Sequence, residues 1–294
     1  MAKARGFAVL IATDGSEVAT AAVDAATKFP WPAGARVSGV VVRGSLATSE
    51  FHEFVWVDLE RSLTGVAENA RKILARRSPD AQVRVVDGPI VDAILKEADR
   101  VGARVIVLGS RGHGALARLL VGSTSLGVVR HMKQAALIVR GRSRDFARMA
   151  VAFDGSTAAR HAVSFLAGLE VRSGGQITLV QVLERVAMTS LALLPSATRA
   201  AVVEQANAFD AAEEKKARRG LDAAADELRR AGWNVDVALR RGAPLHELLM
   251  AAKRTRAQVL VLGARGHSGL ERLLLGSVAE GALHQSPVSV LITR

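Results

Sequence analysis

The chain has 294 residues, a formal net charge of +12 and no cysteine. Without cysteine it has neither disulfides nor thiolate metal sites, and its longest uncharged apolar run, residues 186–198, is too short to span a bilayer. The basic residues are spread over both halves with few aromatic side chains among them, which favours a solvated surface over a nucleic-acid interface. We therefore expect a soluble, cytoplasmic protein that contacts neither membrane nor nucleic acid.

Short apolar runs alternate with helical stretches along the first half of the chain. Strands are predicted at residues 9–13, 37–42, 83–86, 105–108 and 136–140, and helices at 17–29, 52–77, 90–100 and from Ser123 to about 131. Strands built almost wholly of Val, Ile and Leu, alternating with helices, are typical of a parallel sheet that helices cover on both faces. The sequence thus predicts an α/β fold.

The second half repeats the first half. VLIATDGS at residues 9–16 returns as MAVAFDGS at 149–156, and GSRGHGALARLLVGS at 109–123 returns as GARGHSGLERLLLGS at 263–277. The last two strands are expected at 259–262 and 288–293, and an insertion lies between Val182 and Val235. Each half has a common size for one domain, so we predict domains at 1–142 and 147–294.

Two features of each copy fall at the same edge of the predicted sheet. Asp14 follows the first strand and Gly109 follows the fourth, and Asp154 and Gly263 repeat this arrangement. Ligands of parallel sheets bind at the carboxyl ends of the strands, where the topology changes direction. A ligand site is therefore predicted beside these residues in each half.

Both copies also contain the pattern G-x-x-G, nine residues and G-S. Glycines let a ligand approach the main chain, successive N–H groups form an anion-binding nest, and a helix that begins at G-S turns its positive end toward a phosphate. The alternative is that Ser123 and Ser277 only cap their helices, and Ser277 and Glu280 have the spacing of a capping box.

On these residues the whole chain resembles the universal stress protein family, in its tandem two-domain, ATP-binding form. The glycine pattern after a fourth strand is specific to this family when the D-G-S turn follows strand one. The resemblance implies two flavodoxin-like, doubly wound domains, each a five-stranded parallel sheet of order 3-2-1-4-5 with helices on both faces. It also implies one ATP per domain, bound with Mg²⁺ or Mn²⁺.

The resemblance assigns a nucleotide-binding set to each half. The aspartate after the first strand of each half (Asp14 and Asp154) and the valine that ends its second strand (Val42 and Val182) would hold the adenosine part of the nucleotide. The glycine loop and the start of the helix that follows it would hold the phosphates. Arg111 and Arg265 are candidates for bidentate phosphate contacts, whereas His113 and His267 are expected to pack or to face solvent. No residue is predicted as catalytic or as a metal ligand. The full sets are Asp14, Gly15, Val42, Gly109, Arg111, Gly112, Gly122, Ser123 and Thr124 in the first half, and Asp154, Gly155, Val182, Gly263, Arg265, Gly266, Gly276, Ser277 and Val278 in the second.

The second half is the more faithful to the family pattern. It has Pro287 before its last strand and Glu280 in the helix, and the first half lacks both. The glycines are intact in both halves, so nucleotide binding is expected in each.

The predicted function is that of a nucleotide-dependent stress-response sensor or regulator. The sequence has no G-x-x-x-x-G-K-[ST] run, so it lacks the lysine that P-loop NTPases use at the phosphates, and it has no G-x-S-x-G nucleophile elbow. A slow ATPase or an autophosphorylating enzyme that uses the same sites is the main alternative, and a domain pair with empty sites is the third. The sequence does not identify a protein partner.

The closing strand of each half, residues 136–140 and 288–293, is apolar and lies at the sheet edge in the implied order. Exposed apolar edges pair with other strands. We expect the two halves to pack as a pseudo-twofold pair through these strands, with a homodimer formed through the remaining surface.

Overall fold

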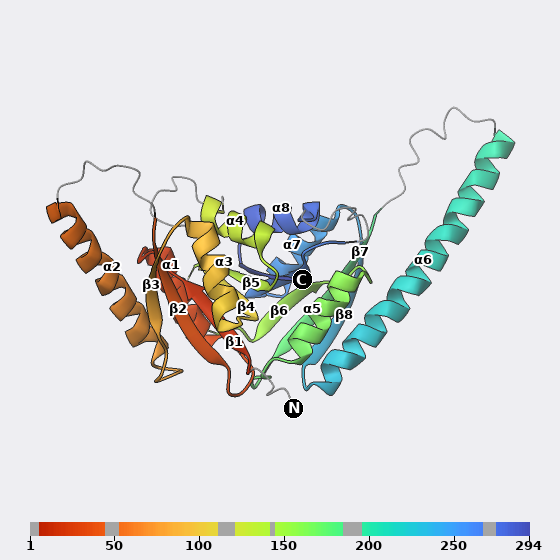
Figure 1. The fold of residues 1–294 in the computed structure, drawn as a ribbon. Helices are drawn as coiled ribbons and strands as arrows, with labels where there is room; N and C mark the ends of the chain where they lie inside the picture. The colour runs from red at the N-terminus through yellow and green to blue at the C-terminus, as the bar shows by residue number, and fades with distance from the viewer. Residues whose placement is uncertain (1–5, 45–52, 111–120, 142–144, 185–195, 267–274) are drawn as a thin grey trace.

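A computed structural model describes residues 6–44, 53–110, 121–141, 145–184, 196–266 and 275–294 (Figure 1). The elements of the first half are β1 (Ala8–Ala12), α1 (Glu17–Lys28), β2 (Arg36–Arg43), α2 (Glu53–Leu74), β3 (Val83–Asp87), α3 (Ile90–Val101), β4 (Val105–Gly109), α4 (Ser123–His131) and β5 (Ala135–Val139). Every element predicted for this half is present, with its ends shifted by a few residues.

The second half repeats this order of elements. They are β6 (Arg148–Ala152), α5 (Thr157–Ala167), β7 (Gln176–Leu183), α6 (Ser196–Arg230), β8 (Asn234–Arg241), α7 (Pro244–Arg254), β9 (Val259–Gly263), α8 (Ser277–Gln285) and β10 (Ser289–Thr293). The predicted join between the domains includes residues 142–144, which lie outside the described ranges, so the boundaries 1–142 and 147–294 stay predictions.

The strands of the described residues form one ten-stranded sheet of order β3-β2-β1-β4-β5-β10-β9-β6-β7-β8. Within each half the strands are parallel, and Val9 of β1 lies between Val37 of β2 and Val105 of β4. Each half therefore has the predicted order 3-2-1-4-5, which confirms two tandem flavodoxin-like domains.

The two halves join through their closing strands. β5 and β10 pair antiparallel, with Leu137 opposite Leu291, and every residue of both strands is buried. The prediction that these apolar edges pair with each other is confirmed, and their pairing removes both edges from solvent.

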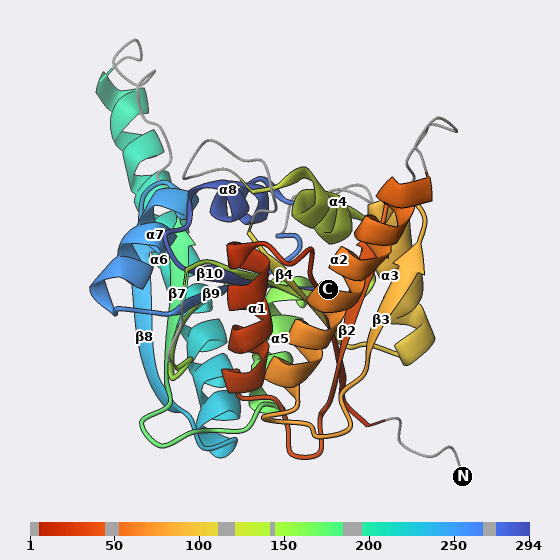
Figure 2. The ribbon, with the colours of Figure 1, turned by 90° about the vertical axis from the view of Figure 1, so that its left-hand side faces the viewer.

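Helices cover both faces of the sheet, and each buried layer runs across both halves. One layer lies under α1, α2, α5 and α6, and the other lies under α3, α4, α7 and α8 (Figure 2). In the first layer, Phe29 stacks against Trp31 at 4.2 Å between ring centroids and against Phe146 of the second half at 5.0 Å. The halves thus share a hydrophobic core as well as a sheet.

The long helices α2 and α6 splay outward at the two flanks of the sheet (Figure 1). α6 has 35 residues where α2 has 22, and part of the insertion predicted after Val182 lengthens this helix. Among the described residues, no helix combines the length and the apolar character that crossing a membrane requires.

Candidate functional site

The D-G-S turns form the same structure in both halves. Oδ1 of Asp14 accepts a hydrogen bond from the N–H of Ser16 at 3.0 Å, and Asp154 and Ser156 repeat this bond at 2.8 Å. The hydroxyls of Ser16 and Ser156 in turn cap α1 and α5. One carboxylate oxygen of each aspartate therefore stabilises the turn after the strand. Neither the stabilisation of this turn by the aspartate nor the capping of the next helix by the serine was predicted from the sequence.

The middle glycine of each turn has a left-handed backbone, with φ of +79° at Gly15 and +78° at Gly155. The surroundings of the two glycines differ. A Cβ on Gly15 would lie 2.5 Å from a methyl group of Val66 on α2, whereas a Cβ on Gly155 would meet no described residue within 4 Å. The second turn is thus the less crowded of the two.

The structure brings the aspartate and the glycine loop together in the second half. A Cβ on Gly266 would lie only 2.7 Å from Oδ2 of Asp154. The sequence placed these residues at one edge of the sheet, and they are neighbours in space. Arg111, Gly112 and His113 of the first half lie outside the described residues, and so does His267 of the second half.

The first glycine of each motif faces a helix. A Cβ on Gly109 would lie 3.1 Å from backbone atoms of Val18 and Ala19, and one on Gly263 would lie 2.6 Å from the Cβ of Ala158. These two glycines let α1 and α5 pack closely on β4 and β9. Helix packing by itself favours glycine at both positions, most strongly at Gly263.

The glycine loops close onto the starts of α4 and α8. The N–H of Gly122 donates to the carbonyl of Ser110 at 2.8 Å, and the N–H of Gly276 donates to the carbonyl of Ala264 at 2.9 Å. These bonds hold the two ends of each loop together. The first-turn N–H groups of each helix, which have no partner within the helix, therefore begin beside the loop.

The capping alternative for the serines is wrong. Gly122 and Gly276 are the N-cap residues and make no side-chain cap bond, and Ser123 and Ser277 are the first helical residues and are exposed. Glu280 bonds to Arg130 instead of returning to the helix start. Both hydroxyls thus lie at the positive end of a helix without serving as its cap.

The two helix starts differ in their hydroxyl groups. Thr124 and Ser125 follow the first serine, where Val278 and Ala279 follow the second. The hydroxyl of Ser125 donates to the carbonyl of Gly109 at 2.7 Å. The first half therefore has one more candidate hydroxyl, that of the half-buried Thr124.

The predicted adenosine contacts, Val42 and Val182, are half-buried near the carboxyl ends of β2 and β7. An ion-pair network flanks each of these strand ends. Arg43, directly after Val42, binds Asp87 of β3 and Glu60 of α2, and the hydrogen bond from Arg43 holds the pKa of Asp87 below its usual range.

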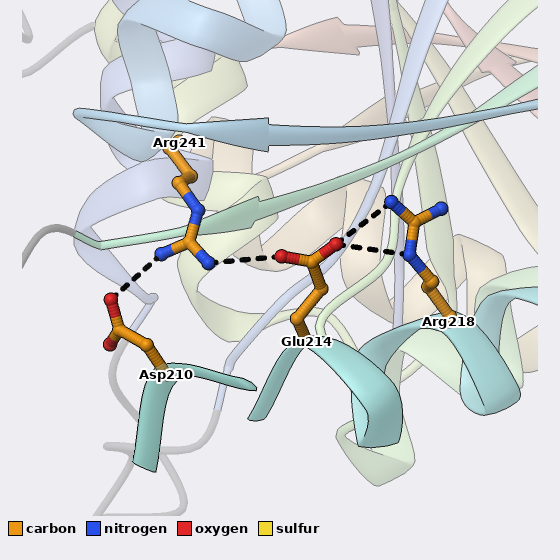
Figure 3. Close-up of polar contacts among 4 residues, drawn as sticks. All are labelled: Asp210, Glu214, Arg218 and Arg241. Atoms are coloured by element: carbon orange, nitrogen blue, oxygen red, sulfur yellow. Dashed lines mark hydrogen bonds and ion pairs between the residues drawn. The ribbon is translucent and has the colours of Figure 1, made fainter. Parts of the chain in front are cut away.

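In the second half the arginine of this network comes from β8. Arg241 binds Asp210 and Glu214 of α6, both at 3.1 Å, and Arg218 binds Glu214 from the next turn of the helix (Figure 3). Hydrogen bonds from Arg218 and Arg241 lower the pKa of Glu214. Both long helices are therefore held to the strand ends by charge pairs beside the candidate sites.

Arg265, in the second glycine loop, is half-buried and lies close enough to Arg294 for its charge to lower the pKa of Arg294, although burial is the larger cause. Within the described ranges, no three His, Asp or Glu side chains gather closely enough to hold a metal ion. The described parts of each site offer an aspartate, backbone N–H groups at a helix start and a serine hydroxyl.

Comparisons of this sequence with known proteins all identify the same family. The sequence profile of the universal stress protein family matches residues 8–140 and 145–294. A universal stress protein of Mycobacterium tuberculosis is 30% identical over 204 residues, which are 65% of this chain and 62% of that protein. The matched region thus spans less than two thirds of that relative. YxiE of Bacillus subtilis, also a universal stress protein, is 27% identical over 51% of this chain and 99% of its own length.

The fold has relatives among solved structures. The crystal structure of a universal stress protein from Archaeoglobus fulgidus matches with a TM-score of 0.69 and 19% identity, over 98% of this chain and 96% of that one. At this identity the match concerns the fold alone, and it extends over both halves.

Proposed function

Because the chain belongs to the universal stress protein family, as two tandem domains, we propose that each domain binds one adenine nucleotide and that the protein acts as a nucleotide-dependent regulator. The observation that carries the proposal is the approach of Asp154 to Gly266, which brings a carboxylate to a glycine loop that ends at a helix start. The repeat places the same residue types in the first half.

The residues present fit a nucleotide. Gly266 leaves open the space that a side chain would fill beside Asp154, and the starts of α4 and α8 present N–H groups and an exposed serine hydroxyl. Backbone N–H groups at a helix start bind phosphate well. ATP with Mg²⁺ or Mn²⁺ is the proposed ligand, with Asp14, Val42 and their repeats at the nucleoside.

The sites are proposed to bind nucleotide with little turnover. Helix starts and glycine loops stabilise bound phosphates without supplying a general base for the attacking water. We expect hydrolysis slower than about 1 per second, well below the ordinary enzyme range. A faster ATPase activity that disappears when the helix starts are altered would favour the enzymatic alternative.

Calorimetric titration with Mg-ATP tests the proposal. It compares Ser→Glu variants at the two helix starts with a Ser→Glu variant at a remote position. Ser123→Glu and Ser277→Glu each place a carboxylate at a helix start, where it suits the helix dipole but repels phosphate. The unaltered protein should bind two equivalents and each variant one. Ser173→Glu makes the same change at an exposed turn between α5 and β7 and should leave two.

The increase in Tm on addition of nucleotide is a second test of the proposal. Ligand at a hundred times its Kd stabilises a protein by about 2.7 kcal/mol, which raises Tm by roughly 5–10 °C for a domain of this size. GTP should produce a much smaller shift than ATP. Absence of any shift, with no nucleotide in acid extracts of the purified protein, would contradict the proposal.

A further inference from the structure

An arginine follows the closing strand of each half and reaches across the junction. Nη2 of Arg140, after β5, donates to the carbonyls of Leu283 and His284 in α8. Nη2 of Arg294, after β10, donates to the carbonyls of Val129 and Arg130 in α4, at 3.2 and 2.9 Å. Each half thus holds the carboxyl-terminal end of a helix that belongs to the other half.

The helices held in this way are the two that begin at the candidate phosphate sites. α4 and α8 have nine residues each, and they lie side by side over the junction (Figures 1 and 2). The last carbonyls of a helix have no partner within it, and a cation there also suits the helix dipole. In so short a helix, a contact at one end constrains the placement of the other end.

A third contact joins the same two helices. Arg130 of α4 pairs with Glu280 of α8 at 2.5 Å. Leu126 and His284 occupy the matching positions in the repeat, so this pair occurs once. The arginine contacts, by contrast, occur in both directions.

The surroundings of the Arg294 side chain are unfavourable for a charge apart from its contacts with α4. The side chain is half-buried, and its Nε atom finds no hydrogen-bond partner among the described residues. Burial and the nearby charge of Arg265 both disfavour its cationic form, and they lower its pKa. The guanidinium is held there by its two hydrogen bonds to the last carbonyls of α4.

We propose that Arg140 and Arg294 are cross-domain positioning residues: Arg294 sets the start of α4 for the nucleotide site of the first domain, and Arg140 sets the start of α8 for that of the second. This inference rests on the proposed function for the identity of the ligand. Its structural core is that the helix that begins at each site is held at its other end by an arginine from the other domain.

The test uses the 294-residue chain with one of its two sites blocked, so that nucleotide binds at the other site alone. One arginine is then replaced in this background. In a Ser277→Glu background only the first site binds Mg-ATP, and Arg294→Met should then raise its Kd about tenfold or more, whereas Arg140→Met should change it less than about twofold. In a Ser123→Glu background the two effects should exchange. Arg294→Lys keeps the charge and should restore part of the lost affinity.

Arg148→Met is the matched control. Arg148 donates to the carbonyl of Arg256 at 3.1 Å, at the opposite end of the strands, so its loss should leave both sites unchanged. Equal weakening of both sites by either arginine variant, or no weakening by either, would overturn the proposal.

Hydrogen exchange without nucleotide separates this inference from the proposed function. Arg294→Met should speed exchange in α4 and Arg140→Met in α8, whether or not ATP binds. If the unaltered protein binds no ATP, the proposed function fails, and hydrogen exchange alone tests the positioning role of the two arginines. Faster exchange in the helix of the other domain supports this role. Unchanged exchange in both helices overturns it.

Discussion

At the residue scale, the glycines of the repeated motif have different neighbours. A Cβ on Gly263 would lie 2.6 Å from the Cβ of Ala158 on α5, and a Cβ on Gly266 would lie 2.7 Å from the carboxylate of Asp154. The first glycine allows a helix to pack on its strand, and the second allows a carboxylate to approach the loop. One motif therefore combines a requirement of the fold with a requirement of the site.

Gly263→Ala should destabilise the protein with little direct effect on a ligand. The added methyl group meets the backbone of Ala158 as well as its Cβ, so α5 must shift, and overpacking of this kind costs about 1–3 kcal/mol. Urea unfolding measures the change. Gly65→Ala, at a helical glycine where the added atom has no neighbour within 4 Å in the described part of the chain, should be neutral or stabilising. Equal stability of the two variants would contradict the packing role.

Glu97 of α3 is a buried carboxylate, with 5% of its surface exposed. It accepts two hydrogen bonds from Arg100, at 2.7 and 2.8 Å, and one from Arg84 of β3 at 3.0 Å. The bonds from Arg100 are the largest cause of a lowered pKa at Glu97. α3 is thus fixed to the edge strand by charge-assisted bonds.

Glu97→Gln should reduce stability in a pH-dependent way. A pKa that is lower in the folded state gives stability that is present above the unfolded value, about 4.3, and lost as pH falls through the folded value. The variant should be less stable by about 1–3 kcal/mol at pH 7, and the difference should shrink toward pH 3. Urea unfolding at both pH values checks this, and a difference that grows on acidification would show the reverse linkage.

At the element scale, the sequence predicts the strands and helices well because each is a continuous apolar run or a helical stretch with a clear turn after it. The D-G-S turn and the glycine motif also fixed which strand ends meet, as Asp154 and Gly266 show. Local patterns can specify such features because the partners lie on neighbouring strands of one domain.

The pairing of the closing strands was predicted, but the side-chain contacts across the junction were beyond sequence reasoning. Glu280 fits a capping box by spacing, yet it bonds to Arg130 of the other half. Arg140 and Arg294 look like ordinary ends of apolar strands, and their carbonyl partners depend on how β5 and β10 pair. The register in which β5 and β10 pair decides these roles, and no local pattern records that register.

The ion pairs of Arg241, at the end of β8, with Asp210 and Glu214 connect α6 to the sheet. Arg241→Met should speed hydrogen exchange of α6 around Asp210, because it removes the tie between this part of the helix and the sheet. High salt should have a similar effect on the unaltered protein and little further effect on the variant. Arg61→Met removes an exposed pair within α2 and should leave α6 unchanged. Salt-insensitive exchange of α6 would count against the network.

At the scale of the whole molecule, the junction is built from three layers of contact. The sheet contributes the antiparallel β5–β10 pair, one face contributes aromatic stacking between Phe29 and Phe146, and the carboxyl edge contributes the arginine contacts to α4 and α8. Buried residues from both halves form each core layer. The two domains are therefore expected to unfold together rather than one by one.

The halves, produced separately by cutting the chain between residues 141 and 145, should each recover the lost edge by pairing with a second copy. Every residue of β5 and of β10 is buried in the intact chain, and an isolated half would expose one of these apolar strands with its unpaired backbone groups. An antiparallel pair of identical strands satisfies those groups and gives a closed twofold dimer. Sedimentation of each half should therefore show dimers, and mixing the halves should yield the heterodimer that resembles the intact chain. Stable monodisperse monomers of both halves would mean that the strand pair contributes little, and that the aromatic and arginine contacts hold the domains together only when the linker keeps them close.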